Sequence, residues 1–546
     1  MQGLMQDWPL LQWRLIDHAA RFHGRTEIVS HGVEGDVRRT DYAGLELRAR
    51  KLAQALARLG VGTGDRVATL AWNSDRHLEI WFGAGGMGAV AHTVNPRLFP
   101  EQIVYILNHA ADRVLCFDLT FLPLVEAIRD RLESVKQFVL MTDQAHMPAD
   151  ASLSPLQCYE DMVAAADGDW AWPMLDETAA VGLCYTSGTT GEPKGVLYSH
   201  RSTVLHTMAT AATDTLGVSA GDTVLPVVPM FHANAWGVPY LAALTGARLV
   251  FNGPHHDAET LWSILDGERV TVTAAVPTIW LALLDYLRKT GKALPHLNAV
   301  TIGGSAAPRS MIAAFEDEYG VKVCHAWGMT ELSPLGSVGT HTRATAALPR
   351  EAQLDVKAKQ GRAVFGVELR AVNSDGHVLP HDGASSGHLQ ARGPWTAMAY
   401  FRRDDDILTA DGWFDTGDVA HIDEHGFMQI TDRAKDVIKS GGEWISSINL
   451  ENAAVGHPDV LEAAVIGLPH PKWDERPLLI VVPEEGVEVT RDEMLDYLKG
   501  KVAKWWLPDD VVTVSEIPHS ATGKILKTAL RERFRDYTLP TAGGAA

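Results

Sequence analysis

Cysteine is scarce in this chain of 546 residues, which contains only four. They are Cys116, Cys158, Cys184 and Cys324, and their spacing matches no cysteine-based metal site. A disulfide-stabilised scaffold is also excluded, because such scaffolds are dense in cysteine. We therefore expect reduced, buried thiols in a cytoplasmic protein.

Positive charge and long apolar runs are also scarce. Lys and Arg number 48 against 68 Asp and Glu, which gives a formal net charge of −20. This charge argues against nucleic acid or an anionic membrane as the main partner, because both would repel the chain. No apolar run reaches the ~18 residues of a membrane-spanning helix. The N-terminus contains Asp7 and Arg14 and lacks a signal-peptide core, so we expect no transmembrane segment.

What is present indicates a large globular protein of the α/β class. A chain of this length exceeds what one hydrophobic core serves, so two or more domains are expected. Helical and strand patterns alternate, with an amphipathic helix over residues 42–59 and a buried strand over 66–70. This alternation predicts a large N-terminal domain of parallel-rich sheets covered by helices. The last 110 or so residues predict a small α+β domain, with helices at 447–455, 491–504 and 525–534.

A glycine- and threonine-rich stretch gives the strongest indication of chemistry. Residues 185–195 read Tyr-Thr-Ser-Gly-Thr-Thr-Gly-Glu-Pro-Lys-Gly between two strand-like segments, which predicts the tip of a hairpin. Glycine backbone freedom, hydroxyl donors and one lysine suit a polyphosphate. The stretch is not a Walker A loop, because the required spacing is missing. The alternative is an ordinary surface turn, which the length of the pattern disfavours.

This stretch resembles the phosphate loop of the adenylate-forming superfamily, which includes acyl-CoA synthetases, adenylation domains and beetle luciferases. Further motifs of that superfamily follow in order along the chain. They occupy residues 229–237 (PMFHANAWG), 303–308 (GGSAAP), 326–331 (AWGMTE), 414–418 (FDTGD), 432–436 (DRAKD), 439–444 (KSGGEW) and 517–527 (IPHSATGKILK).

The resemblance implies a site for ATP and Mg²⁺. The residues it assigns to ATP or AMP are Thr186, Ser187, Gly188, Thr189, Thr190, Lys194, Gly304, Ser305, Ala326, Trp327, Thr330, Asp418, Arg433 and Lys524. Glu331 and Thr186 are the expected metal ligands, and Asp418 is expected to accept both ribose hydroxyls. Trp327 replaces the usual tyrosine, which keeps a stacking face but loses a hydroxyl contact. The residues implied in catalysis are Lys524, Thr330, Glu331 and His232.

The same resemblance also implies an acyl site, a coenzyme A path and a hinge. His232 is expected beside the acyl carboxylate, Trp236 as a gate to an apolar tunnel, and Gly304 at the same site. A buried histidine with a purely structural role is the alternative for His232. The residues implied along the coenzyme A path are Lys439, Gly441, Gly442, Glu443 and Trp444. Lys435 matches the pivot, which divides the chain into an N-terminal domain (1–432), a hinge (433–436) and a mobile C-terminal domain (437–546).

The resemblance therefore implies an ATP-dependent acyl-CoA ligase for a medium- or long-chain fatty acid. A 3-methylmercaptopropionate-CoA ligase, or another short-chain acid-CoA ligase, is the alternative. A luciferase-like enzyme or a stand-alone adenylation enzyme fits less well, and no phosphopantetheine attachment motif (Asp-Ser-Leu) follows the last domain. The expected partners are small molecules, namely a carboxylic acid, ATP and CoA. The sequence leaves the oligomeric state open, and a homodimer is what the resemblance suggests for it.

Overall fold

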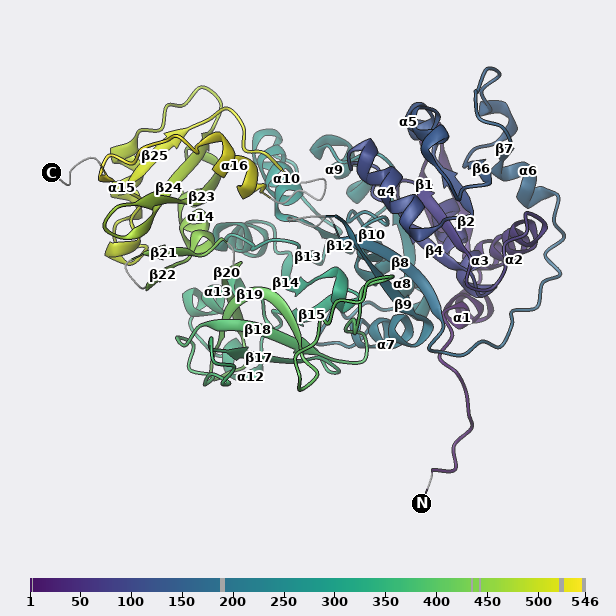
Figure 1. Ribbon diagram of the computed structural model, residues 1–546, viewed down its shortest axis with the longest axis horizontal. Coiled ribbons are helices and arrows are strands. Elements are labelled where there is room, and N and C mark those ends of the chain that lie inside the picture. The colour runs from purple at the N-terminus through teal and green to yellow at the C-terminus, as the bar shows by residue number, and fades with distance from the viewer. Residues whose placement is uncertain (2, 187–191, 434–435, 441–442, 520–524, 543–546) are drawn as a thin grey trace.

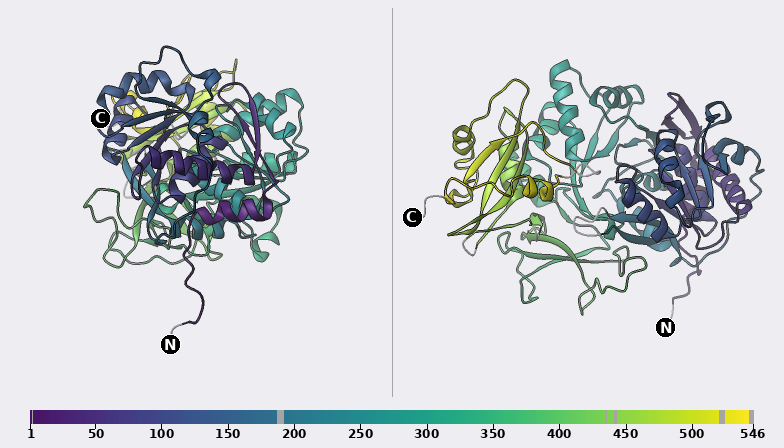
Figure 2. Two further views of the ribbon diagram at one scale, coloured as in Figure 1. Left: turned by 90° about the vertical axis from the view of Figure 1, so that its right-hand side faces the viewer. Right: turned by 45° about the horizontal axis from the view of Figure 1, so that its top comes forward.

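The computed structural model describes residues 1, 3–186, 192–433, 436–440, 443–519 and 525–542. Figure 1 shows a large body of mixed sheets and helices, with a small domain of β21–β25 and α14–α16 at one end of the long axis. Figure 2 shows the same separation after the molecule is tilted. Residues 3–8 are exposed and extend away from the body, whereas Leu11 and Gln12, just before α1 (Trp13–His23), are buried in it.

The first sheet of the large body has seven strands in the order β7-β6-β5-β3-β4-β8-β9. All neighbours pair in parallel except β9, which runs antiparallel to β8. The strands are β3 (Arg66–Leu70), β4 (Val90–Thr93), β5 (Val114–Phe117), β6 (Gln137–Leu140), β7 (Leu156–Cys158), β8 (Ala180–Thr186) and β9 (Lys194–Ser199). The predicted parallel-rich sheet is confirmed, and so is the antiparallel pairing that flanks the glycine-rich stretch.

The second sheet has nine strands in the order β16-β15-β14-β13-β12-β10-β11-β1-β2. Its centre is parallel, while β2, β15 and β16 pair antiparallel at the edges. The strands are β1 (Glu27–His31), β2 (Val37–Asp41), β10 (Thr223–Pro226), β11 (Arg248–Phe251), β12 (Val272–Ala275), β13 (Ala299–Ile302), β14 (Lys322–Gly328), β15 (Leu335–Val338) and β16 (Arg362–Ala363). Parallel β13 and β14 bring their carboxyl ends together, as two of the predicted nucleotide motifs require.

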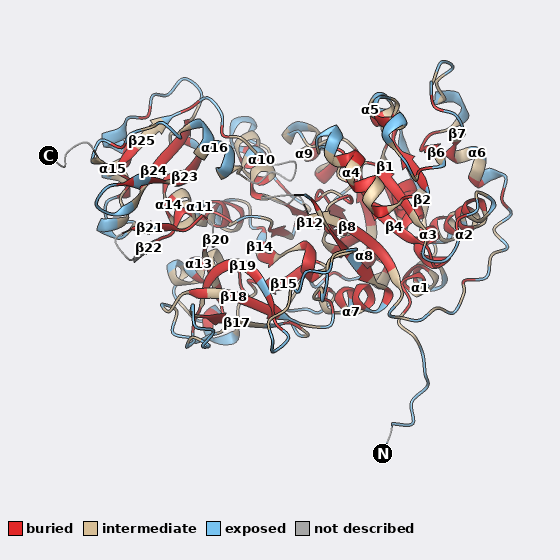
Figure 3. Ribbon diagram, viewed as in Figure 1, coloured by how far each residue is buried: buried red, intermediate tan, exposed pale blue. Residues whose placement is uncertain are grey.

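Helices fill three layers around these two sheets. One buried cluster joins α1, α2 (Tyr42–Arg58), α3 (Asp75–Gly86) and α8 (Val238–Thr245) to strands of both sheets, so these helices form the middle layer. Helices α4 (Pro100–Ala110) and α5 (Leu122–Ile128) cover the outer face of the first sheet. The outer face of the second is covered by α9 (Ala258–Gly267), α10 (Pro277–Thr290) and α11 (Arg309–Ala313). Burial is accordingly concentrated in the strands and on the helix faces that meet them (Figure 3).

Two smaller sheets complete the chain. An antiparallel sheet closes the large body with β17 (Glu368–Val372), β18 (Gly387–Arg392), β19 (Phe414–Ile422) and β20 (Met428–Arg433). The small domain has one sheet of β21 (Ile438–Ser440), β22 (Glu443–Ile445), β23 (Val460–His470), β24 (Asp474–Pro483) and β25 (Asp510–Thr513). Its two faces are covered by α14 (Ser447–Val455) with α15 (Arg491–Leu498), and by α16 (Lys527–Arg533). The predicted fold class, a large α/β domain followed by a small α+β domain, is confirmed.

The other α-helices of the described residues are α6 (Tyr159–Ala164), α7 (His200–Thr210), α12 (Arg343–Ala346) and α13 (Arg350–Ala358). Two helices end earlier than predicted. The sequence pattern over residues 201–216 predicts one helix, but α7 ends at Thr210, where the Thr215 hydroxyl donates to the carbonyls of Ala209 and Thr210. Likewise α15 ends before Gly500, whose φ of +79° is outside the helical region. Among the described residues no helix is long and apolar enough to cross a membrane.

Candidate active site

A cavity of about 720 Å³ lies between the large body and the small domain. It brings together predicted residues from five separate stretches of the chain. Those that line it are Thr186, Lys194, His232, Trp236, Gly304, Ala326, Trp327, Thr330, Glu331 and Arg433. The small domain contributes His519, Ile525, Leu526 and Thr528, which flank the predicted catalytic lysine in sequence. A second cavity of about 240 Å³ shares several of these residues and adds Ser305 and Asp418.

The structure describes the two ends of the predicted phosphate loop. Thr186 and Lys194 pair across β8 and β9, so both enter the cavity from the same point of the first sheet. Lys194 places its Nζ 4.7 Å from the ring centroid of Tyr400, a residue that the motifs had not indicated. The remaining predicted loop residues, Ser187, Gly188, Thr189 and Thr190, lie outside the described residues, and so does the predicted catalytic Lys524.

The same tyrosine holds the predicted metal ligand. Its hydroxyl donates to Oε1 of Glu331 at 2.8 Å, and the backbone N–H of Ala397 donates to the Glu331 carbonyl at 2.7 Å. Burial, with the Glu331 charge beside it, raises the pKa of Tyr400, so the phenol stays protonated and remains a donor. Glu331 and Thr330 lie on the short helix η6 (Thr330–Leu332), which Tyr198 ties to β9 by a 2.8 Å bond to the Thr330 carbonyl.

These groups fit a magnesium ion that is bound mostly by substrate. Mg²⁺ prefers oxygen ligands and usually takes one or two carboxylates together with phosphate oxygens and water. Glu331 supplies a carboxylate and Thr186 a hydroxyl in one cavity, with Lys194 as a nearby cation. The chemistry of this donor set suits the metal complex of a nucleotide.

Arg433 and Trp327 both contact the carboxylate of Asp418. Its pairing with Arg433 across β19 and β20 brings the Arg433 Nε to 2.9 Å from Oδ1. The indole N–H of Trp327 donates to the other oxygen, Oδ2, at 3.0 Å. A Cβ on Gly336 would lie 2.4 Å from the indole ring, so glycine there leaves the space that Trp327 occupies. The substitution of tryptophan for tyrosine therefore provides a different hydrogen bond, which fixes the carboxylate predicted to bind ribose.

The turn after β13 is fixed by a histidine that sequence reasoning missed. Nε2 of His325 accepts from the backbone N–H of Ala307 at 3.3 Å, and its Nδ1 lies 3.2 Å from the Lys357 carbonyl. Burial lowers the pKa of His325 to about 4, so the ring stays neutral and can accept at Nε2. No sequence signal pointed to this role, because His325 precedes the recognised motif and lies in a strand.

The predicted acyl residues lie on a backbone of unusual handedness. Positive φ angles follow one another at Ala233, Asn234, Ala235, Trp236 and Gly237, with values between 43° and 76°. For residues other than glycine this conformation costs roughly 1–2 kcal/mol each, less for asparagine. His232 precedes this turn and lines the cavity, and the Trp236 indole lies against Gly303, where a Cβ would come within 3.1 Å of the ring. The motif gave no indication of a left-handed turn.

In the small domain, His519 of the last motif contacts a carboxylate. Its Nε2 lies 2.6 Å from Oε1 of Glu462 on β23, and its backbone forms an isolated bridge with Ile525. The hydrogen bond to Glu462 raises the pKa of His519. Both sides of the segment that carries the predicted lysine are thereby attached to the small domain.

A buried ionic cluster joins the small domain to the end of β20. Asp432 accepts from the backbone N–H of Ser447 at 2.8 Å and from its hydroxyl at 2.6 Å. Lys527 donates to the same hydroxyl, and its Nζ lies 2.8 Å from Oε1 of Glu451. Burial alone would lower the pKa of Lys527, but the charges of Glu451 and Asp432 raise it. Serine is a favourable N-cap residue, so the predicted helix start at 447 makes Ser447 the expected cap. The N-cap of α14 is instead Ser446, which leaves Ser447 for this cluster.

Of the predicted coenzyme A residues, Lys439 is the one whose side chain the structure describes. Lys439 is an exposed residue of β21, and it is not among the described residues that line either cavity. In Figure 1, β21 and β22 lie at the lower edge of the small domain, whereas α16 faces the large body. Gly441, Gly442 and the predicted pivot Lys435 lie outside the described residues. Glu443 and Trp444 belong to β22, and their side chains are likewise outside the description.

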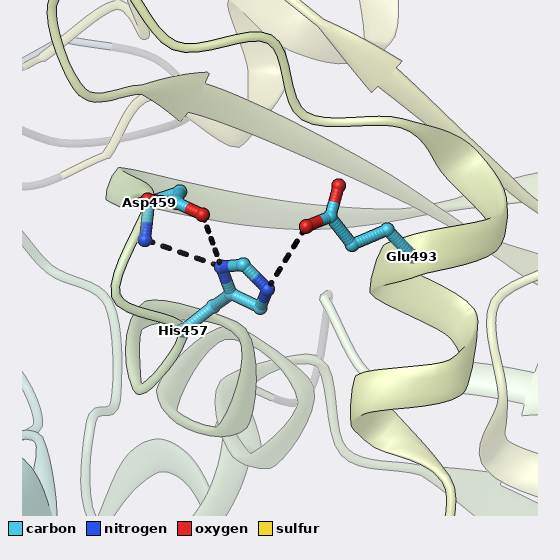
Figure 4. Close-up of side chains that lie close together, drawn as sticks. All are labelled: His457, Asp459 and Glu493. Atoms are coloured by element: carbon cyan, nitrogen blue, oxygen red, sulfur yellow. Dashed lines mark hydrogen bonds and ion pairs between the residues drawn. The ribbon is translucent and has the colours of Figure 1, made fainter.

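His457, Asp459 and Glu493 form a separate cluster in the small domain (Figure 4). Nδ1 of His457 accepts from the backbone N–H of Asp459 at 3.2 Å, and Nε2 faces Glu493 at 3.7 Å. The two carboxylates thus approach opposite ring nitrogens, and one of these nitrogens is already an acceptor. This arrangement connects the end of α14 to the start of α15 and carries no argument for a metal.

Comparison with known proteins agrees with this geometry. The model of the AMP-binding enzyme family matches residues 15–401, and that of the AMP-binding enzyme C-terminal domain matches residues 449–524. A 3-methylmercaptopropionyl-CoA ligase of Ruegeria lacuscaerulensis is 54% identical over 536 residues, covering 98% of this chain and 99% of the relative. A medium-chain-fatty-acid–CoA ligase of Ectopseudomonas oleovorans is 51% identical over 539 residues, covering 99% and 98%.

A crystal structure shares the architecture. The anthranilate CoA ligase AuaEII in complex with anthranoyl-AMP superimposes with a TM-score of 0.87 at 24% identity, covering 97% of this chain and 99% of that one. At this identity the likeness concerns the fold alone. The family matches cover most of the chain, and two relatives align over nearly its whole length with half of their residues identical. The chain therefore belongs to the family of AMP-binding enzymes.

Proposed function

We propose that this chain is an ATP-dependent acyl-CoA ligase. In the first step, a carboxylate oxygen of the acid bonds to the α-phosphorus of ATP, and the bond to the bridging oxygen breaks to release pyrophosphate. In the second step, the CoA thiol attacks the carbonyl of the acyl-adenylate, loses its proton, and AMP leaves. The observation that carries the proposal is that one cavity of about 720 Å³ is lined by both the predicted nucleotide residues and the predicted acyl residues.

The residues divide between binding and stabilisation of charge. Asp418, fixed by Trp327 and Arg433, would accept the ribose hydroxyls. Lys194 and the Thr330 hydroxyl would approach the phosphates, and His232 would lie beside the acid. Mg²⁺, held by Glu331 with Thr186, would neutralise phosphate charge when bound. The other predicted loop residues and Lys524 keep the roles inferred from the motifs.

Lys524 provides the test of this mechanism. If it stabilises charge at the α-phosphate, Lys524→Ala should slow acyl-adenylate formation by about 10²–10⁴-fold, as removal of one such donor does in other enzymes. It should still convert synthetic acyl-AMP and CoA to the thioester. Pyrophosphate release measures the first step, and Lys472→Ala, at an exposed lysine of the same domain, is the control. Equal losses in both steps would contradict the assignment.

The two steps need two arrangements of the small domain. We propose the boundaries 1–432, 433–436 and 437–546, and the hinge falls between the two matched family ranges. In the present arrangement of the domains, residues flanking Lys524 line the cavity and Lys439 does not. This difference supports assigning the present arrangement to adenylate formation. The coenzyme A residues, with Gly441, Gly442, Glu443 and Trp444, would reach the cavity after rotation about Lys435.

The acid is proposed to be a medium- or long-chain fatty acid, with 3-methylmercaptopropionate as the second candidate. Relatives of both kinds are about equally similar to this chain. A panel of acids from three to sixteen carbons separates them. Each methylene buried in an apolar tunnel contributes about 0.8 kcal/mol, close to a fourfold gain in kcat/KM. A fatty acyl ligase should show that slope over several carbons, whereas a methylmercaptopropionate ligase should peak at a five- or six-atom chain. The homodimer and the cytoplasmic location stay predictions.

A further inference from the structure

The left-handed turn at residues 233–237 has positive φ angles at five successive residues. Three of its residues, Ala233, Ala235 and Trp236, carry side chains that disfavour positive φ, and asparagine and glycine occupy the other two positions. Such a run persists only where the surroundings determine it, and strain of this kind concentrates at functional sites. The turn carries Trp236 and directly follows His232, and both line the cavity.

One end of the turn is held by a hydrogen bond to the first sheet. The Sγ of Cys184 donates to Oδ1 of Asn234 at 3.1 Å, and Thr93 Oγ1 lies 3.2 Å from the same sulfur. All three side chains are buried. Burial raises the pKa of the Cys184 thiol to about 11, so the sulfur keeps its proton and remains a donor. Asn234 also lies against Gly182, whose Cβ would be 3.5 Å from its amide nitrogen.

The other end is held by packing. Gly237 has a φ of +76°, and a Cβ there would lie 2.8 Å from the ring of His206. His206 is itself fixed, because its Nε2 accepts from the backbone N–H of Leu335 at 3.2 Å. The turn is therefore held between β8 and α7, and its free side chain, Trp236, extends to Gly303 and Gly304.

We propose that Asn234 is a positioning residue of the acyl site, which acts through the placement of Trp236. Its hydrogen bond with Cys184 stabilises the left-handed turn and so sets the indole against Gly303 and Gly304. Because Cys184 lies two residues before Thr186 on β8, the same bond connects the acyl site to the strand that leads into the phosphate loop. This inference rests on the proposed function, since it assigns Asn234 an influence on which acid is accepted.

Three substitutions separate the hydrogen bond from the backbone conformation. Asn234→Gly removes the bond but tolerates positive φ, whereas Cys184→Ala removes the same bond from the other side. Ala235→Gly leaves the bond and relieves the backbone, since glycine adopts positive φ at no steric cost. The matched control is Cys158→Ala, because the Cys158 thiol is buried and donates at 3.2 Å to the Thr142 carbonyl, far from the cavity residues.

The measured quantity is the ratio of kcat/KM for a twelve-carbon acid to that for a four-carbon acid. Asn234→Gly and Cys184→Ala should each change this ratio by about fivefold or more in the same direction, and the double variant should change it no further. Cys158→Ala should leave the ratio unchanged. A ratio unaffected by either variant, or effects that multiply in the double variant, would overturn the proposal.

Thermal unfolding tests whether the backbone of the left-handed turn is strained. Ala235→Gly should raise the Tm by about 1–2 °C, the reverse of the usual effect of this substitution, because the folded state loses strain. A fall in Tm would show that the turn is not strained, and the proposal would fail. Absence of ligase activity with every acid would refute the proposed function instead, and the thermal measurement would still decide the nature of the turn.

Discussion

Trp327 and Asp418 are 91 residues apart, yet their contact governs one of the main predicted interactions with the nucleotide. The motifs indicated both residues, because each belongs to a short pattern with a fixed spacing. They could not indicate that the indole N–H would donate to the carboxylate, since that depends on how β14 and β19 meet. Tyr400 was missed for a related reason. It lies in an irregular segment after β18, outside the recognised patterns.

The hydrogen bond between these two residues gives a prediction for ATP binding. Trp327→Phe keeps an aromatic face but removes the indole N–H that donates to Asp418. Loss of a bond to a charged group costs about 1.5–3 kcal/mol, so we expect KM for ATP to rise by about 10-fold or more with little change in kcat. Trp395→Phe is the control, because its indole N–H donates to the Leu335 carbonyl in the same core. Equal effects in the two variants would reduce Trp327 to a packing role.

His519 gives a prediction for pH dependence. Its pKa is raised in the folded state by Glu462, so its contribution to stability is fully present below its unfolded pKa, ordinarily about 6.5. That contribution is lost as pH rises through the folded pKa. The difference in Tm between wild type and His519→Gln should therefore be largest near pH 6 and shrink toward pH 8.5. A difference independent of pH would mean that the ring contributes by packing alone.

At the scale of elements, period and spacing predicted most helices and strands well. Strand β3 and helix α14 have the predicted bounds. The left-handed turn at 233–237 was not predictable in this way. Its sequence contains one glycine and one asparagine among residues that favour ordinary helix or strand, and it is held by contacts with β8 and α7.

Helix α16 carries a prediction about the orientation of the small domain. Lys527→Met would leave Glu451 and Asp432 buried without their cation, which strongly destabilises such a site. Because Asp432 lies on β20, which belongs to the sheet that closes the large body, we expect adenylate formation to slow by about 10-fold or more while acyl transfer from synthetic acyl-AMP is retained. Half-reaction assays measure both steps.

The matched control for this variant breaks a buried ion pair within the small domain. Arg476 Nε lies 2.6 Å from Asp509 Oδ1, with both side chains largely buried. Arg476→Met should therefore lower stability without favouring one half-reaction over the other. If Lys527→Met behaves in the same way, the cluster stabilises the small domain and does not fix its orientation.

At the scale of the whole molecule, the two-domain architecture followed from length and from the order of the motifs. The relation between the domains did not, because it depends on contacts such as that of Asp432 with Ser447. Motif order also could not show that His519 would line the cavity while Lys439 would not. The site is therefore predictable as a set of residues, while its assembly required the structure.

Strand β20 ends at Arg433 and β21 begins at Ile438, so a very short connection joins the two domains. Such a tether keeps the small domain at an effective concentration in the millimolar range, which falls with roughly the −3/2 power of tether length. Lengthening the connection fourfold with Gly and Ser should thus lower that concentration by about eightfold. Turnover should fall by up to that factor, and separately added small domain should restore it in a concentration-dependent way. If turnover does not change with tether length, the small domain is docked on the large body most of the time with either tether. The rate-limiting step would then follow docking.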